Sequence, residues 1–205
     1  MRMMRLGRPA SWQASTWDPL GLAILLYIRD TLQIPHTAGP RVPPVTPTVA
    51  VTQSKLDPAR LAEQWNQRWA EATGPGGNVD IGMESPTSPY FDHMPELRIA
   101  YQEHLDPAAR WFAPSQRDSA ERFRTDRAAG HREPIGELVA DWQQTAGREP
   151  APFSLAVYSV PVEGFDTWST GPFKYVVAQA LASDRDAFIE WLRPVIARAA
   201  SGQPE

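Results

Sequence analysis

The chain has 205 residues, a formal net charge of −4 and no cysteine. It is long enough to bury a core without covalent or metal cross-links, and the missing thiols exclude disulfide scaffolds, thiolate metal sites and cysteine nucleophiles. The acidic balance also argues against general binding of nucleic acids.

Residue usage indicates an origin and a compartment. Lysine occurs only at Lys55 and Lys174, while arginine, alanine, proline and tryptophan are plentiful. This bias is typical of a GC-rich bacterial genome, and a chain without cysteine suits a reducing cytoplasm. We therefore expect a bacterial, cytoplasmic protein.

The first predicted elements are a tail and a buried helix. Residues 1–16 are expected to form a loose N-terminal tail, so that a single domain spans residues 17–205. The uncharged run at 19–28 predicts a largely buried helix over 19–33. Ten apolar residues are too few to cross a bilayer, which needs about 20, so no membrane span is expected.

Three Asp-Pro pairs mark predicted helix starts, at Asp18, Asp57 and Asp106. An aspartate before a first-turn proline accepts hydrogen bonds from free backbone N–H groups, and the proline has no N–H to leave unpaired. The second start opens a helix over 58–73 with one apolar stripe. That stripe consists of Leu61, Trp65, Trp69 and Ala72.

A proline-rich connection at 35–48 leads into the first predicted strand, near 45–52. The end of this segment alternates valine with threonine, which is typical of a half-buried strand. Because proline is tolerated at sheet edges but not in central strands, we expect an edge strand here.

The segment 91–105 predicts a helix and a candidate metal site. On one side of this helix His93, Glu96, Glu103 and His104 fall within an arc of about 100°. Imidazole and carboxylate groups are suitable ligands for zinc, iron or manganese. Because Pro95 belongs in a first turn, His93 is expected at or beyond the helix end, and the alternative interpretation is an ordinary solvated face.

A polar helix is predicted over 115–129, followed by an amphipathic helix over 134–146. Arginines around the polar helix could form a surface that faces acidic groups. They are Arg110, Arg117, Arg122, Arg124, Arg127 and Arg132. Acids at i,i+4 spacing offer internal ion pairs, so a solvated face is the alternative. Arg117 and Arg124 are the candidates for contact with a partner.

Two hydrophobic strands are predicted near 153–162 and 173–182, where valine, tyrosine and phenylalanine concentrate between glycine and proline. We expect them to pair antiparallel. Trp168 in their connection and Lys174, a charge on an otherwise apolar strand, are candidate binding residues. A last helix is predicted from Ser183, with a kink or break at Pro194.

These elements predict an α+β fold with a small, mainly antiparallel sheet packed by five to seven helices. No catalytic motif is evident, so the favoured hypothesis is a non-catalytic protein that binds another protein as an accessory, adaptor or immunity-type factor. A first alternative is a metal-dependent enzyme, such as a hydrolase, that uses the 91–105 face and a divalent transition metal; otherwise no cofactor is expected. A second alternative is a structural component of a larger assembly.

Overall fold

The computed structural model describes residues 12–37, 41–74, 79, 85, 88–130 and 133–203. Its strands are β1 (Trp12–Trp17), β2 (Phe153–Val160), β3 (Thr167–Gly171) and β4 (Lys174–Ala178). Its α-helices are α1 (Leu20–Thr31), α2 (Pro58–Thr73), α3 (Pro95–Ala128), α4 (Pro134–Ala146), α5 (Gln179–Ser183) and α6 (Arg185–Ser201), with a 3-10 turn at Pro89–Phe91. The α+β class and the range of helix number are thus confirmed for the described residues.

The four strands form one mixed sheet in the order β1-β2-β4-β3. β1 runs parallel to β2 and β2 runs parallel to β4, while only β3 and β4 are antiparallel. The prediction of a mainly antiparallel sheet is therefore wrong. The two strands predicted near 153–162 and 173–182 do pair, as β2 and β4, but in the same direction.

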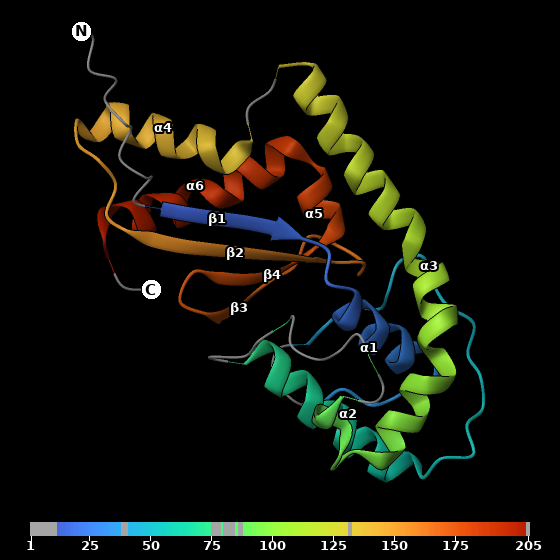
Figure 1. The fold of residues 1–205 in the computed structure, drawn as a ribbon. Helices are drawn as coiled ribbons and strands as arrows, with labels where there is room; N and C mark the ends of the chain where they lie inside the picture. Colours follow the sequence, from blue (N-terminus) through green and yellow to red (C-terminus); the bar gives the residue numbers. More distant parts are fainter. Residues whose placement is uncertain are drawn as a thin grey trace, which may run out of the picture.

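The parallel pairing follows from a strand that lies inside the predicted connection. β3 forms there and takes the return direction, so β4 runs back along β2 and fills the place between β2 and β3 (Figure 1). Adjacent strands are about 4.8 Å apart, and the six residues from 161 to 166 easily carry the chain across two strand positions.

Two further strand predictions are corrected. Residues 12–16, expected in a loose tail, form most of β1, while residues 1–11 lie outside the described residues. The segment 45–52 is not a strand: it contributes one isolated bridge, from Val45 to Val162. Pro47 within it, and Pro43 and Pro44 just before it, interrupt the row of backbone donors that a ladder needs.

Helices cover both faces of the sheet (Figure 1). On one face α4 and α6 close a core in which Leu155 and Val157 of β2 meet Ile135 and Leu192. On the other face α1, α2 and the first half of α3 enclose a larger core that includes Tyr158 of β2. Among the helices of the described ranges, none is both long enough and apolar enough to span a membrane.

α3 joins what the sequence divides into two helices, 91–105 and 115–129. It is continuous over 34 residues, about 50 Å, with Pro107 and Pro114 inside it. Burial continues past the first proline, because Ala108 and Phe112 belong to the buried side of the helix. Asp106 is therefore an exposed residue within a helix and not a cap.

Of the other predicted helix caps, one is confirmed and the others differ in the structure. Asp57 accepts hydrogen bonds from the backbone N–H groups of Ala59 and Arg60, at 3.0 and 3.3 Å, as predicted. Asp18 makes no capping bond, and α1 begins one residue after Pro19. Near the C-terminus a short α5 ends at Ser183 and Asp184 caps α6, which is unbroken across Pro194.

Candidate functional site

The four predicted metal ligands lie along the start of α3 and in the turn before it. His93 precedes the helix and is exposed, Glu96 is in the first turn, and Glu103 and His104 lie two turns further on. No three histidine, aspartate or glutamate side chains within the described ranges are placed to hold a metal ion. These residues thus form no ligand cluster in this structure.

His104 has an apolar environment instead. Its ring centroid is 6.0 Å from that of Tyr27 on α1. The Tyr27 ring also contacts the ring of Trp111, which lies two turns after His104 on α3. Burial lowers the pKa of His104 below 6.5, and the nearby carboxylate of Glu103 opposes this shift. The neutral ring is therefore the form that this contact favours.

The candidate binding residues of the hairpin lie apart from both hollows described below. Trp168 on β3 is half-buried and packs against the larger core. Lys174 opens β4, where its carbonyl accepts a hydrogen bond from the Thr170 hydroxyl at 3.3 Å. Neither residue lines either of these two hollows.

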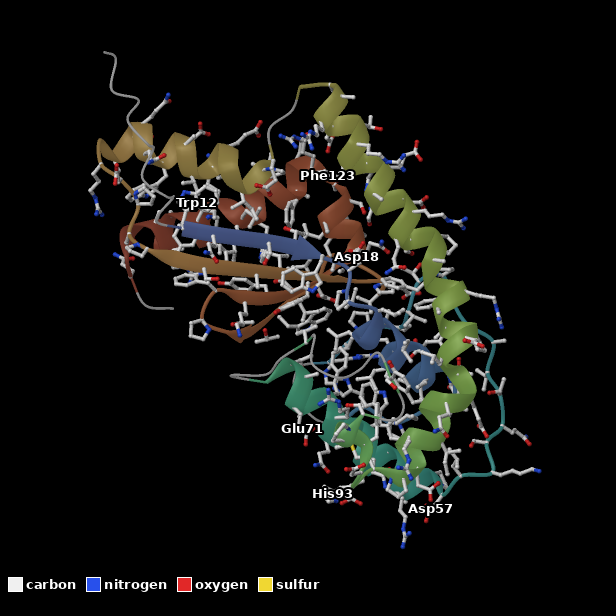
Figure 2. The ribbon with its side chains drawn as sticks, viewed as in Figure 1. Trp12, Asp18, Asp57, Glu71, His93 and Phe123 are labelled. Carbon is white, nitrogen blue, oxygen red and sulfur yellow. The ribbon has the colours of Figure 1, made fainter. Side chains whose placement is uncertain are left out.

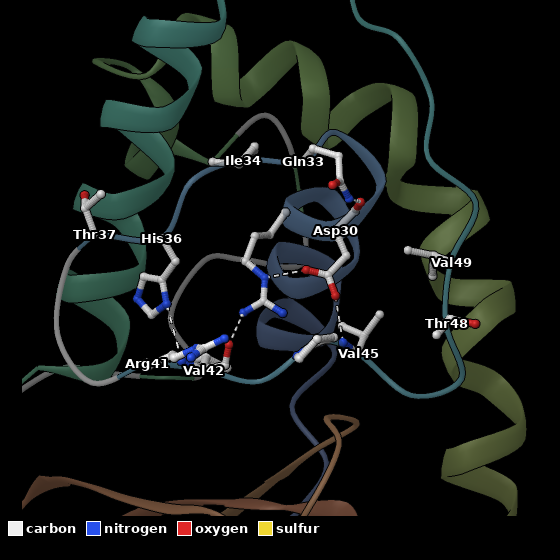
Figure 3. A pocket seen from close by; sticks show the side chains of 12 residues that line it. Asp30, Gln33, Ile34, His36, Thr37, Arg41, Val42, Val45, Thr48 and Val49 are labelled. Carbon is white, nitrogen blue, oxygen red and sulfur yellow. Dashed lines mark hydrogen bonds and ion pairs between the residues drawn. The ribbon is translucent and has the colours of Figure 1, made fainter.

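A first hollow, of about 630 Å³, lies under the proline-rich connection (Figure 3). Arg29 is only 5% exposed and donates to the carbonyls of Val42 and Pro43, at 3.0 and 2.6 Å, and to the carboxylate of Asp30. The second oxygen of Asp30 accepts the N–H of Val45 at 2.7 Å. The charged pair therefore anchors the connection to α1.

A second hollow, which we call the β1–α3 groove, has a volume of about 810 Å³. One wall is the end of β1, another is the second half of α3, and the starts of α4 and α6 close the remaining side. Its lining includes Ala14, Thr16, Asp18, Ser119, Arg122, Phe123, Arg124, Ser159, Arg185 and Phe188. This volume lies within the range of known ligand-binding clefts.

The floor of the groove lies where two parallel strands end. β1 pairs with β2 up to Trp17 opposite Tyr158, so Asp18, the first residue after β1, lies near the level of Ser159, the second-last residue of β2. Ser159 is only 3% exposed, yet it lines the groove. The carboxyl ends of parallel strands are a common location for binding sites in sheets with crossover connections.

The α3 wall carries an apolar and a basic group. Phe123 is 59% exposed and faces the groove from the side of α3 that is turned toward α5, whereas His93 lies at the far end of the molecule (Figure 2). Arg122 is half-buried and donates to the Ser119 hydroxyl at 3.0 Å. Among the described residues it has no carboxylate partner.

Of the two arginines singled out from the sequence, one lines the groove. Arg124 does so, and its nearest carboxylate, Glu121, is 3.9 Å away with both side chains about three-quarters exposed. Such a pair contributes little to stability. Arg117 is exposed on the same helix but does not line the groove. Arg132 lies outside the described residues.

The helix starts at the rim are already occupied by acids of the chain itself. Glu133 accepts the N–H of Gly136 at the start of α4, at 3.0 Å. Asp184 accepts the N–H of Ala187 at the start of α6, at 3.1 Å. Because carboxylates hold the positions that a free anion would take, the groove is not built for a simple anion.

Sequence reasoning found the arginines but missed the floor of the groove. Asp18 is predicted only as a helix cap and Ser159 belongs to no recognisable motif, and their place at the groove depends on β1, most of which falls in the predicted tail. An aspartate directly after the short alternating run from 12 to 17 is the one local signal of a strand end. No protein-family model, curated protein or solved structure matches this chain.

Proposed function

We propose that this protein acts by binding another protein, and that its partner docks in the β1–α3 groove. The observation that carries this proposal is that an exposed aromatic ring, Phe123, and the guanidinium of Arg122, which has no carboxylate partner within the described part of the chain, both line an open groove. Aromatic and arginine side chains are the residues that most often dominate protein–protein binding energy.

The mixed charge of the groove supports a protein as its ligand. Arg122 and Arg124 line the α3 wall together with Asp126, and Asp18 on the floor and Glu133 at the rim supply further negative charge. A polypeptide can present acidic, basic and apolar groups together, which a simple ion cannot. We place this interaction in the cytoplasm, as the cysteine-free composition suggests.

Site-specific photo-crosslinking tests the proposal. Phe123 is replaced by benzoyl-phenylalanine in the full chain, and the matched control carries the same group at Phe165, which is 55% exposed and does not line the groove. Irradiation in cells that naturally make the protein should give one discrete adduct from position 123 and none from position 165.

The adduct is then checked by a second change. Arg122→Glu reverses the charge of the wall and should reduce the yield of the position 123 adduct by tenfold or so, because like charges across an interface oppose docking. Absence of an adduct at position 123, or the same adducts from both positions, would contradict the proposed function.

A further inference from the structure

The two edges of the sheet differ in how they are protected. β3 forms one edge and its register with β4 is interrupted between Ser169 and Gly171, which is the kind of irregularity that discourages pairing with other chains. β1 forms the opposite edge. Its sequence from Trp12 to Trp17 has no charge, no proline and a regular register with β2.

The hydrogen bonds of the sheet show which groups of β1 point outward. Ala156 donates its N–H to the Phe173 carbonyl on the β4 side, so Leu155 turns its backbone groups toward β1. Ala14 lies opposite Leu155. In a parallel pair, when the N–H and C=O of one residue bond to the neighbouring strand, the N–H and C=O of the residue opposite point away from the pair. The N–H and C=O of Ala14 therefore point to the free edge of the sheet. Those of Thr16, two residues further along β1, point the same way.

These outward groups open into the groove. Ala14 and Thr16 both line it, and no hydrogen bond from another described residue reaches their outward backbone groups. The two N–H and C=O pairs repeat at about 6.6 Å, the spacing of alternate residues in a strand. Only an extended polypeptide offers donors and acceptors at that repeat.

We infer that the partner binds by adding an extended strand to the free edge of β1, with an acidic side chain of that strand against Arg122. This inference rests on the proposed function and specifies its mode. Strand addition takes affinity from backbone hydrogen bonds and specificity from the side chains that meet the groove. The guanidinium of Arg122 donates to the Ser119 hydroxyl but has no carboxylate partner among the described residues, and it is complementary to a carboxylate.

The probe is a phage-displayed library of random twelve-residue peptides, selected on the full chain after depletion on the Phe123→Asp variant. The enriched peptide is synthesised with a fluorescent label, and its affinity is measured by anisotropy. Enriched sequences should share an aspartate or glutamate. Arg122→Gln should weaken binding about tenfold, as loss of one charged contact predicts, while Arg117→Gln, outside the groove, should not.

The edge itself is tested at Ala14. Ala14→Pro removes an outward N–H and leaves the β1–β2 ladder in place, because proline is tolerated where the N–H faces away from the sheet. Binding should weaken about tenfold or more. Ala14→Val keeps the N–H, favours a strand and should bind within about threefold of the original chain. Circular dichroism checks that both variants are folded.

Amide exchange followed by NMR gives a second reading that needs no variant. Peptide binding should slow exchange at Ala14 and Thr16, while Gln13 and Ser15 are already protected by β2. Undiminished binding by Ala14→Pro together with unchanged exchange at these two amides would overturn strand addition and leave the proposed function standing.

Two other results bear on the same claim. Failure to enrich any peptide that depends on Phe123 would overturn both the groove as a docking site and the strand within it. A dimer in light scattering that Ala14→Pro converts to a monomer would also overturn the inference, because the occupant of the edge would then be a second copy of this chain.

Discussion

His104 lies where α3 meets α1, with its ring against Tyr27 and its pKa lowered by burial. A histidine with a lowered pKa in the folded state binds fewer protons than the same residue in the unfolded chain, so acid favours unfolding. Its contribution to stability is complete above about pH 6.5 and is lost as the pH falls from there through the lower, folded-state pKa.

We predict that His104→Gln, which does not titrate, weakens the fall in melting temperature between pH 7.5 and pH 5. Calorimetry across this range measures the difference from the original chain. His93→Gln is the matched control, since His93 is exposed and lies before the helix. A pH dependence that is unchanged in His104→Gln, or equally reduced in both variants, would contradict this account.

Residue predictions are correct where contacts within one helix decide the outcome, and they fail where contacts between distant parts of the sequence decide it. The stripe of Leu61, Trp65, Trp69 and Ala72 is buried as its spacing predicts, because one helix face decides it locally. The groove floor could not be predicted in this way. Asp18 and Ser159 come together only through the β1–β2 register, which no local pattern specifies.

At the level of elements, the same short motif has two different roles. "LDPAR" opens α2 at Asp57, whereas "LDPAAR" continues α3 through Asp106. The difference lies in the tertiary contacts, because α3 packs along α1. Ala108 and Phe112, one turn apart, are both buried after Pro107, and this burial keeps the helix continuous past the proline. Local capping signals therefore predict the start of α2 correctly but predict two helices where α3 is one continuous helix.

We predict that Asp57→Ala lowers the free energy of unfolding by about 1 kcal/mol, because two backbone N–H groups lose their acceptor. Asp106→Ala should change it by less than about 0.5 kcal/mol, since the residue is exposed within a helix and alanine is a good helix former. Urea titration of both variants measures this. Equal losses in the two variants would contradict the difference in role.

At the scale of the whole molecule, α1 is the most continuously buried helix of the described fold. Every residue from Gly21 to Leu26 is buried, and Trp65 of α2 donates its ring N–H to the Leu25 carbonyl at 2.7 Å. The second half of α3 contrasts with this, because no residue from Arg117 to Ala128 is buried. The half of α3 that walls the groove is thus far less supported by burial than its first half.

We predict that amides of α1 exchange hydrogen most slowly of all helices, and that those from Arg117 to Ala128 exchange faster than those from Leu97 to Phe112 of the same helix. Hydrogen exchange with mass spectrometry on the full chain resolves these segments. Uniform protection along α3 would show that its second half has support that burial alone does not account for.

The position of β1 in the chain also affects how the protein is made. β1 pairs with a strand about 140 residues further on, and synthesis at about 5–20 residues per second separates the two by roughly 7 to 28 s. During that time β1 has no partner on either side, whereas α1, α2 and α3 are already available to pack. The nascent chain must therefore keep this uncharged segment from pairing elsewhere until β2 emerges and closes the sheet.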